Sequence, residues 1–103
     1  MFEIGKAYTR DEIHAQLGGN RRSCLLQARG GVVGICYQPQ MNPQAPRALV
    51  VGHSVQREKA AQQLATQASA VPVFAKKTAN AYEHLGNFKG ESYSAGVLRL
   101  APA

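Results

Sequence analysis

Two cysteines and three histidines are the side chains of this sequence best suited to nucleophilic or metal chemistry. Cys24 and Cys36 are too far apart for a CxxC pair, and no histidine follows them at zinc-binding spacing. His14, His53 and His84 belong to three separate predicted elements and form no HExxH motif; lone histidines are typically surface or hydrogen-bonded residues. We therefore expect two small buried thiols, and we predict no metal site and no cofactor.

Carboxylates add little for acid–base catalysis. Asp11 and Glu12 lie in the first turn of a predicted helix, where the free amides favour negative charge. Glu83 lies in a predicted strand, where it either faces a cleft or pairs across the sheet with Lys89. A nucleophilic Cys36 needs an activating base that the sequence does not reveal. We predict no catalysis, and a small hydrolase that acts on a nucleotide through Glu83 or Cys36 is retained as an alternative.

Positive charge is in excess. Twelve Lys and Arg residues against six Asp and Glu give a formal net charge of +6 at pH 7. Such an excess attracts polyanions, although it also keeps a protein surface soluble. The cations in predicted loops or at strand ends are Arg21, Arg22, Arg47, Lys76, Lys77 and Lys89. We expect them to converge on one rim and neutralise phosphates; the alternative is that they are scattered.

Aromatic side chains accompany these cations. The rings in or next to predicted strands are Tyr8, Tyr37, Tyr82, Phe88 and Tyr93. Such rings stack on nucleic-acid bases, so we expect at least one of them to line a cleft beside the positive rim. The alternative is that they are core side chains whose hydroxyl groups reach a partner.

The elements that must position these residues can be predicted from local patterns. Residues 9–12 (TRDE) form a capping-box pattern, which predicts a short helix that ends at Gly18-Gly19 and packs by Ile13 and Leu17 against a sheet. The other predicted elements are a hairpin of residues 24–28 and 32–37, an extended proline loop 38–47, a strand 48–52, a helix 54–69, a strand 71–75, and a meander of strands 81–85, 88–93 and 96–100 with a turn at 86–87.

The longer helix has a buried stripe of small residues, and the element order predicts the fold class. Ala60, Leu64 and Ala68 form the stripe, whereas Arg57 and Lys59 lie on the solvent side. Two helices among many short strands favour a small curved sheet or pseudo-barrel flanked by these helices over a doubly wound parallel sheet. We predict a single α+β domain over residues 1–103.

The sequence contains no apolar run long enough to span a membrane. Its opening, MFEIGKAYTR, lacks the apolar core of a secretory signal. We therefore expect a cytoplasmic protein with reduced thiols and no membrane partner. A disulfide between neighbouring strands is the alternative for the two cysteines.

Two blocks of the sequence resemble a known family. The first block is residues 5–13 (GKAYTRDEI) with 17–19 (LGG), and the second is residues 71–76 (VPVFAK) with 81–88 (AYEHLGNF). Both are similar to segments of the SRA-like domains of bacterial modification-dependent HNH endonucleases and related helicase-attached domains, which belong to the PUA-like group. The resemblance implies a curved β-barrel flanked by helices that holds a modified or flipped base in an aromatic-lined cleft. It implies reading rather than cutting.

We accordingly predict a nucleic-acid-binding domain, with DNA favoured over RNA. The predicted binding residues are Tyr8, Arg10, Arg21, Arg22, Asn42, Lys76, Lys77, Tyr82 and Lys89, and Gln38 and Glu83 join Asn42 as candidates for reading the edge of a base. The alternative is a protein-interaction module, as a homodimer or as an accessory subunit of a larger defence or repair system, that uses a sheet edge or the proline loop.

Overall fold

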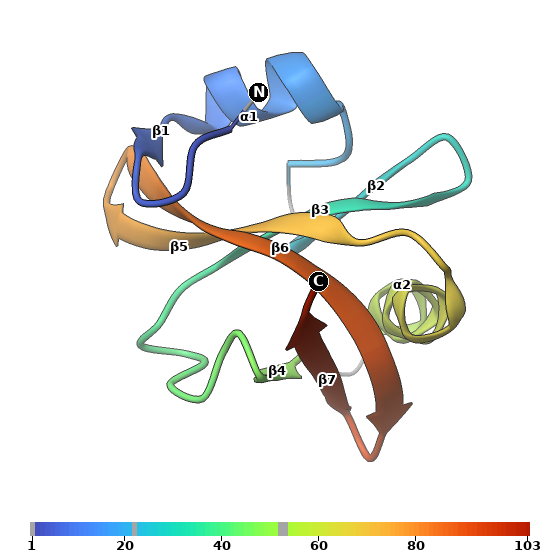
Figure 1. The fold of residues 1–103 in the computed structure, drawn as a ribbon. Coiled ribbons are helices and arrows are strands. Elements are labelled where there is room, and N and C mark those ends of the chain that lie inside the picture. Colours follow the sequence, from blue (N-terminus) through green and yellow to red (C-terminus); the bar gives the residue numbers. More distant parts are fainter. Residues whose placement is uncertain (1, 22, 52–53) are drawn as a thin grey trace.

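A computed structural model describes residues 2–21, 23–51 and 54–103, and its fold is a curved mixed sheet with two helices packed on it (Figure 1). The elements are β1 (Ala7–Tyr8), α1 (Arg10–Leu17), β2 (Leu25–Ala28), β3 (Gly31–Tyr37), β4 (Ala48–Val50), α2 (Val55–Thr66), β5 (Val71–Thr78), β6 (Ala81–Ser94) and β7 (Val97–Pro102). The seven strands form one sheet in the order β2-β3-β5-β6-β7-β4, and β1 pairs with β6. The predicted α+β curved sheet with two helices is confirmed.

One long strand, β6, joins the two halves of the sheet. It pairs with β5 along its first half and with β7 along its second half. The predicted turn at Gly86-Asn87 is wrong, because both residues lie inside β6. Gly86 has a φ of 122°, and the register with β5 shifts beside it, so Leu85 is the extra residue of a β-bulge. The glycine therefore bends the strand instead of reversing it.

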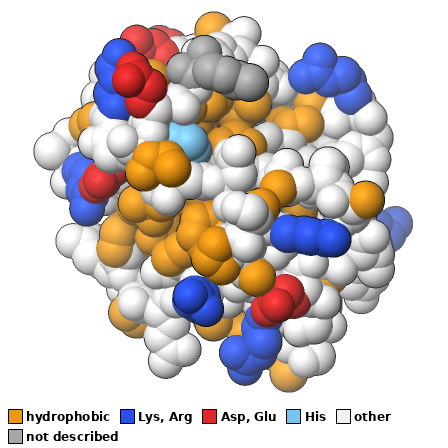
Figure 2. Space-filling view, viewed as in Figure 1, with side chains coloured by type: hydrophobic (Ala, Val, Ile, Leu, Met, Phe, Trp, Pro, Cys, Tyr) orange, Lys and Arg blue, Asp and Glu red, His pale blue; other side chains and the backbone are white. Residues whose placement is uncertain are grey.

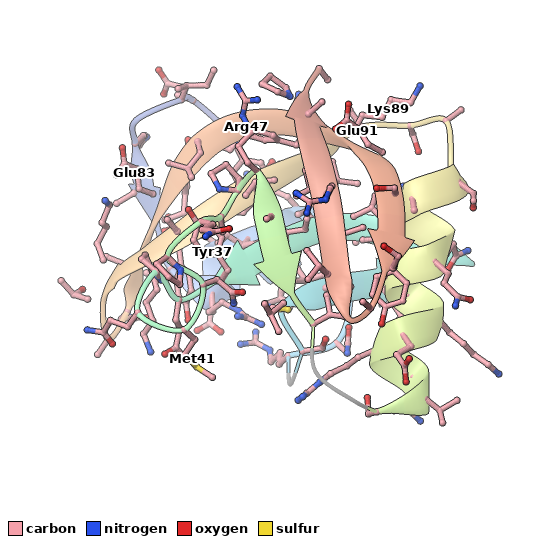
Figure 3. All side chains as sticks on the ribbon, turned by 90° about the horizontal axis from the view of Figure 1, so that it is seen from below. Tyr37, Met41, Arg47, Glu83, Lys89 and Glu91 are labelled. Atoms are coloured by element: carbon pink, nitrogen blue, oxygen red, sulfur yellow. The ribbon has the colours of Figure 1, made fainter. Side chains whose placement is uncertain are left out.

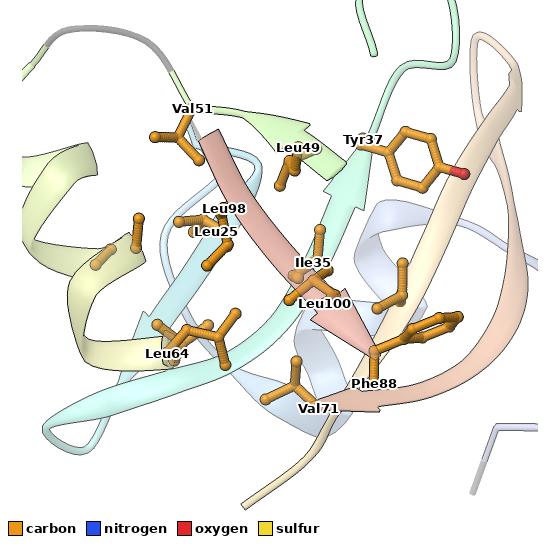
Figure 4. Close-up of a cluster of buried hydrophobic side chains, with 14 of the residues drawn as sticks. Leu25, Ile35, Tyr37, Leu49, Val51, Leu64, Val71, Phe88, Leu98 and Leu100 are labelled. Carbon is orange, nitrogen blue, oxygen red and sulfur yellow. The ribbon is translucent and has the colours of Figure 1, made fainter. Parts of the chain in front are cut away.

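Alternating side chains of the central strands supply two separate cores. On β3, Ile35 belongs to the larger core under α2, and Cys36 belongs to the smaller core under α1. On β5, Val73 and Phe74 alternate in the same way. Figure 4 shows the larger core, where Leu64 of α2 packs among side chains from the strands. Because both faces of the sheet are covered in this way, binding side chains must lie at its edges or in its loops.

Helix α1 begins at the predicted capping box. The Thr9 hydroxyl accepts a hydrogen bond from the Glu12 amide (3.1 Å), and the Thr9 amide donates to the Glu12 carboxylate (2.8 Å). Ile13 is fully buried, and Leu17 packs against the same smaller core. The packing of these two side chains fixes how the helix is turned about its own axis, and in this orientation Arg10 lines a pocket beside the sheet.

Helix α2 comes very close to the sheet. Ala60, Ala61 and Leu64 are fully buried, and β6 carries Gly90 where the helix crosses it. A β carbon at Gly90 would lie 2.6 Å from the carbonyl carbon of Leu64 and 2.9 Å from the Cα of Ala65. Only glycine fits at this crossing without a shift of the helix.

Helix α2 is shorter than predicted. It ends at Thr66 rather than Ser69, and Ala68 is exposed, so the expectation that Ala68 belongs to the buried stripe is wrong. The Gln67 side chain accepts a hydrogen bond from the Val32 amide (3.2 Å) and donates to the Val32 carbonyl (3.0 Å), which fixes the end of the helix on β3. In the described chain, neither helix is long and apolar enough to cross a membrane.

The proline loop, residues 38–47, is folded rather than extended. The amides of Met41 and Asn42 both donate to the Gln38 carbonyl (3.0 Å each). The side-chain oxygen of Asn42 accepts a hydrogen bond from the Val50 amide of β4 (2.8 Å). The prediction of an extended loop is wrong, because these local hydrogen-bond partners fold the backbone into consecutive turns.

His84 is the buried polar residue of the smaller core. Its ring lies near those of Phe2 and Phe74, at centroid distances of 5.8 Å and 5.1 Å. Neither ring nitrogen of His84 has a hydrogen-bond partner among the residues that the structure describes. The expectation of a surface or hydrogen-bonded histidine is wrong at this position, where the ring packs as an aromatic side chain.

Gly90→Ala tests the close approach of α2. We expect the variant to lose about 2–3 kcal/mol of unfolding free energy, because the added methyl group forces the helix away from the sheet. Gly31→Ala is the matched control, since a β carbon there meets only the Gln67 side chain, at 3.6 Å. Urea unfolding followed by circular dichroism measures both variants, and equal stability of the two would contradict the packing.

Candidate functional site

A pocket of about 460 Å³ opens where β2 begins and β3 ends. The first turns of both helices and the 38–47 loop contribute to it; Figure 3 shows Tyr37 and Met41 on this side of the molecule. The lining residues are Arg10, Arg21, Ser23, Cys24, Cys36, Tyr37, Gln38, Met41, Asn42, Val50, Val51, Arg57 and Tyr82. No Asp or Glu is among the described lining residues, so the charged groups of the pocket are all arginines.

Arg10 is held in place from three sides. Its Nε donates to Nε2 of His14 (3.1 Å), and one Nη donates to the Arg21 carbonyl (3.1 Å). Its guanidinium lies over the Tyr82 ring, 5.4 Å from the centroid, as a cation–π contact. Nδ1 of His14 pairs with the Gly18 carbonyl (2.8 Å), which leaves Nε2 as the acceptor for Arg10. The positive charge of Arg10 is therefore positioned before any ligand binds.

Arg21 and Arg57 complete the positive lining. Arg21 forms an exposed ion pair with Asp11 (2.7 Å), a kind of contact that contributes little stability. Arg57 forms no ion pair or side-chain hydrogen bond with another described residue, and its backbone amide donates to the Ser54 hydroxyl that caps α2 (3.1 Å). Its guanidinium is therefore not needed to hold α2 together.

Two short polar side chains of the pocket are oriented by backbone amides. Oδ1 of Asn42 accepts from the Val50 amide (2.8 Å), and Oγ of Ser23 accepts from the Leu25 amide (3.2 Å). Each oxygen already accepts one hydrogen bond, which orients the side chain and leaves the Asn42 NH2 group and the Ser23 hydroxyl hydrogen as free donors for a ligand.

Cys24 and Cys36 are free thiols at facing positions of the hairpin, where the Cys36 amide donates to the Cys24 carbonyl (2.9 Å). Cys36 is buried as expected, whereas Cys24 is half-buried. Burial raises the pKa of both thiols, that of Cys36 to about 11, and the positive charge of Arg10 acts in the opposite direction on each. Both side chains are therefore protonated at neutral pH and present apolar surface to the pocket.

The aromatic cleft is smaller than predicted. Tyr37 and Tyr82 line the pocket, but Tyr37 is only 5% exposed and Tyr82 only 7%. The guanidinium of Arg10 also lies over the Tyr82 ring. Burial raises the pKa of Tyr37. Tyr8 belongs to the smaller core and accepts a hydrogen bond from the Glu3 amide (2.7 Å), and Phe88 belongs to the larger core. Core packing, the alternative for these rings, describes Tyr8 and Phe88, and it also describes most of the surface of Tyr37 and Tyr82, which belong to the larger and the smaller core, respectively.

The fold brings some of the predicted binding residues together. Those that line the pocket are Arg10, Arg21, Asn42 and Tyr82, with the candidate Gln38. Lys76 and Lys77 line a neighbouring hollow that shares Gln38 with the pocket. Lys89 lies in the second half of β6 and, in Figure 3, far from Met41 at the pocket. Arg22, like Gly52 and His53, lies outside the described residues.

Glu83 has a different partner from the one predicted. Its carboxylate pairs with Lys77 (3.1 Å), on the neighbouring strand β5. The predicted cross-strand pair with Lys89 is wrong, because both residues lie in β6 and a strand does not pair with itself. Glu83 is not among the residues that line the pocket.

Arg57, Ser23 and the two cysteines are lining residues that the sequence analysis missed. The helical period places Arg57 and Lys59 alike on the solvent side of α2, so it does not single out Arg57. Figure 2 shows that Lys and Arg side chains on the face in view are separated by other side chains. The convergence of positive charge is therefore local to the pocket rather than a broad patch on that face.

Comparisons with known proteins bear on the fold. Neither protein-family models nor curated proteins gave a match. Among solved structures, the chain is similar to the SRA domain of SUVH5, in a crystal structure of its complex with hemi-methylated CG DNA. The TM-score is 0.67 and the identity 15%, with 99% of this chain and 89% of that chain covered. The chain therefore has an SRA-like fold, as the resemblance implied, whereas the link to HNH endonucleases stays a prediction.

The raised pKa of Cys36 predicts slow alkylation at neutral pH. Only the thiolate reacts, so in a Cys24→Ser variant the rate with iodoacetamide should keep rising to a pH of about 11. An ordinary thiol would level off near its pKa of ~8.5. Mass spectrometry follows the modification, and circular dichroism at each pH confirms that the chain stays folded. A plateau below pH 9 would contradict the burial of this side chain.

Proposed function

We propose that this chain binds DNA and holds one base, turned out of the duplex, in the pocket at the end of β3. The observation that carries the proposal is the convergence of Arg10, Arg21 and Arg57 on a pocket that no acidic residue of the described chain lines. The SRA domain of SUVH5, which has a similar fold, is in complex with hemi-methylated DNA. That complex favours DNA over RNA and a modified base as the target.

The pocket is suited to a single base. Its volume of about 460 Å³ lies within the range of small-ligand sites. Turning a base out of the duplex costs a few kcal/mol, and stacking returns ~1–3 kcal/mol per base. The planar guanidinium of Arg10, backed by Tyr82, offers the flat surface for stacking. Hydrogen bonds from the pocket supply the rest.

The positive rim provides for the phosphates. Arg57 is exposed, which suits contact with the DNA backbone beside the extruded base. Arg21 is exposed as well, but Asp11 neutralises part of its charge. Lys76, in the neighbouring hollow, extends this surface. Lys77 contributes less, because Glu83 already neutralises part of its charge. Arg22 stays a predicted phosphate contact next to Arg21 in the sequence.

The hydrolase alternative lacks support from its two candidate residues. The thiol of Cys36 has a raised pKa, which opposes nucleophilic attack at neutral pH. Glu83 is paired with Lys77 and is not among the residues that line the pocket. Reading of DNA is the function that the arrangement favours.

Arg57→Gln tests the proposed phosphate contact. A phosphate contact releases about one counterion, so the slope of log affinity against log salt should become less steep by about 0.9 in this variant. Lys89→Gln is the matched control, because it removes the same charge at a position away from the pocket and should leave the slope unchanged. Fluorescence anisotropy with a labelled duplex at several salt concentrations measures the slopes.

Two outcomes of that titration would contradict the proposal. The first is an absence of binding to any duplex at low salt by the unaltered chain. The second is an equal change of slope in the two variants, because it would mean that net charge, and not the pocket rim, determines the affinity.

A further inference from the structure

The polar groups of the pocket share one hydrogen-bonding character. Arg10, Arg21 and Arg57 carry only donors. Arg10 uses its Nε–H on His14 and one Nη–H on the Arg21 carbonyl, and its remaining N–H groups are available. Each arginine therefore favours a ligand atom that accepts hydrogen bonds or carries negative charge.

The amide of Asn42 is oriented in the same sense. Because its Oδ1 accepts from the Val50 amide (2.8 Å), the group left for a ligand is the NH2 donor. Ser23 is similar, since its Oγ already accepts from the Leu25 amide. A freely rotating asparagine side chain could turn either its NH2 group or its oxygen toward a ligand. The hydrogen bond from the β4 backbone fixes the orientation of the Asn42 side chain.

Acceptors are scarce in comparison. Two carboxylates pair with cations of the pocket or of the neighbouring hollow, Asp11 with Arg21 and Glu83 with Lys77. Neither is among the residues that line the pocket. The cysteine thiols are weak hydrogen-bonding groups. Among the side chains of the described lining, the uncharged acceptors are the Gln38 amide, the tyrosine hydroxyls, and the oxygens of Asn42 and Ser23, each of which already accepts one backbone hydrogen bond.

We infer that the pocket selects a base by its acceptor atoms, and that it prefers a keto pyrimidine or a pyrimidine with an anionic 5-substituent to a cytosine read through its amino group. The inference rests on the proposed function, because it names the class of base that the same pocket takes. Cytosine presents an N4 amino donor, which is normally met by Asp or Glu. In this pocket the amino group would give up its hydrogen bonds to water without gaining one to a carboxylate, which weakens binding. A carbonyl or carboxylate of the base would instead accept hydrogen bonds from several donors of the pocket.

The test uses duplexes that differ at one position. The position carries thymine, 5-methylcytosine, 5-carboxycytosine or unmodified cytosine, each opposite an abasic site so that extrusion does not require breaking a base pair. Thymine and 5-methylcytosine share the methyl group and differ along the ring edge: thymine has a C4 carbonyl and one N3–H donor, whereas 5-methylcytosine has an N3 acceptor and an N4 amino group with two N–H donors. The two modified cytosines share the amino group and differ in charge. We expect thymine and 5-carboxycytosine each to bind about tenfold more tightly than 5-methylcytosine.

Asn42→Asp provides a specificity swap. The carboxylate still accepts from the Val50 amide, but it replaces the NH2 donors by an acceptor with negative charge. We expect the preference for 5-carboxycytosine over 5-methylcytosine to be lost or reversed. Asn87→Asp is the control for the added charge, because Asn87 is exposed in the middle of β6 and lines neither this pocket nor the hollows beside it.

The outcomes separate the inference from the proposed function. Tighter binding of 5-methylcytosine than of thymine and 5-carboxycytosine would overturn the inference and leave DNA reading in place. Equal affinity for all four duplexes would overturn the inference and the extrusion of a base, but not DNA binding. Failure to bind any of them at low salt would overturn both. A preference unchanged in Asn42→Asp would overturn the part of the inference that assigns the selection of the base to the oriented NH2 group of Asn42.

Discussion

The pocket depends on the interactions that hold Arg10 at the start of α1. The helix can begin there because the capping box of Thr9 satisfies its first amides. One turn later His14, tied to the Gly18 carbonyl, accepts the Arg10 Nε–H, and the Arg21 carbonyl accepts a second N–H. A guanidinium restrained in this way loses little side-chain entropy on binding. The helix cap is thus connected to a positive charge at the edge of the sheet.

The curved sheet explains why the site lies where it does. Both faces of the central strands are buried, one under each helix, so the open positions are where strands end. The bulge at Leu85 and the close crossing at Gly90 let one strand, β6, take part in both halves. As a result the first turns of α1 and α2, which are far apart in the sequence, both reach the pocket at the end of β3.

Local patterns predicted the parts of this structure that local interactions decide. The Thr9 cap, the hairpin of residues 24–28 and 32–37 and the number of short strands led to the α+β curved sheet. The prediction of a turn at Gly86 was wrong, because a glycine between two β-leaning segments is typical of a β-bulge as well as of a turn. The place of Arg57 at the pocket and the orientation of Asn42 depend on strands brought together over long distances, which no spacing in the sequence shows.

The claim that donors from separate elements meet around one ligand is tested most directly by an NMR titration of the isotope-labelled protein with a DNA duplex. We expect the side-chain NH2 signals of Asn42 and the Nε–H signal of Arg57 to shift together and to saturate at the same DNA concentration. Backbone signals near Lys89 should stay in place. Shifts confined to the region of Lys89 and Arg47, with Asn42 and Arg57 unmoved, would contradict the account.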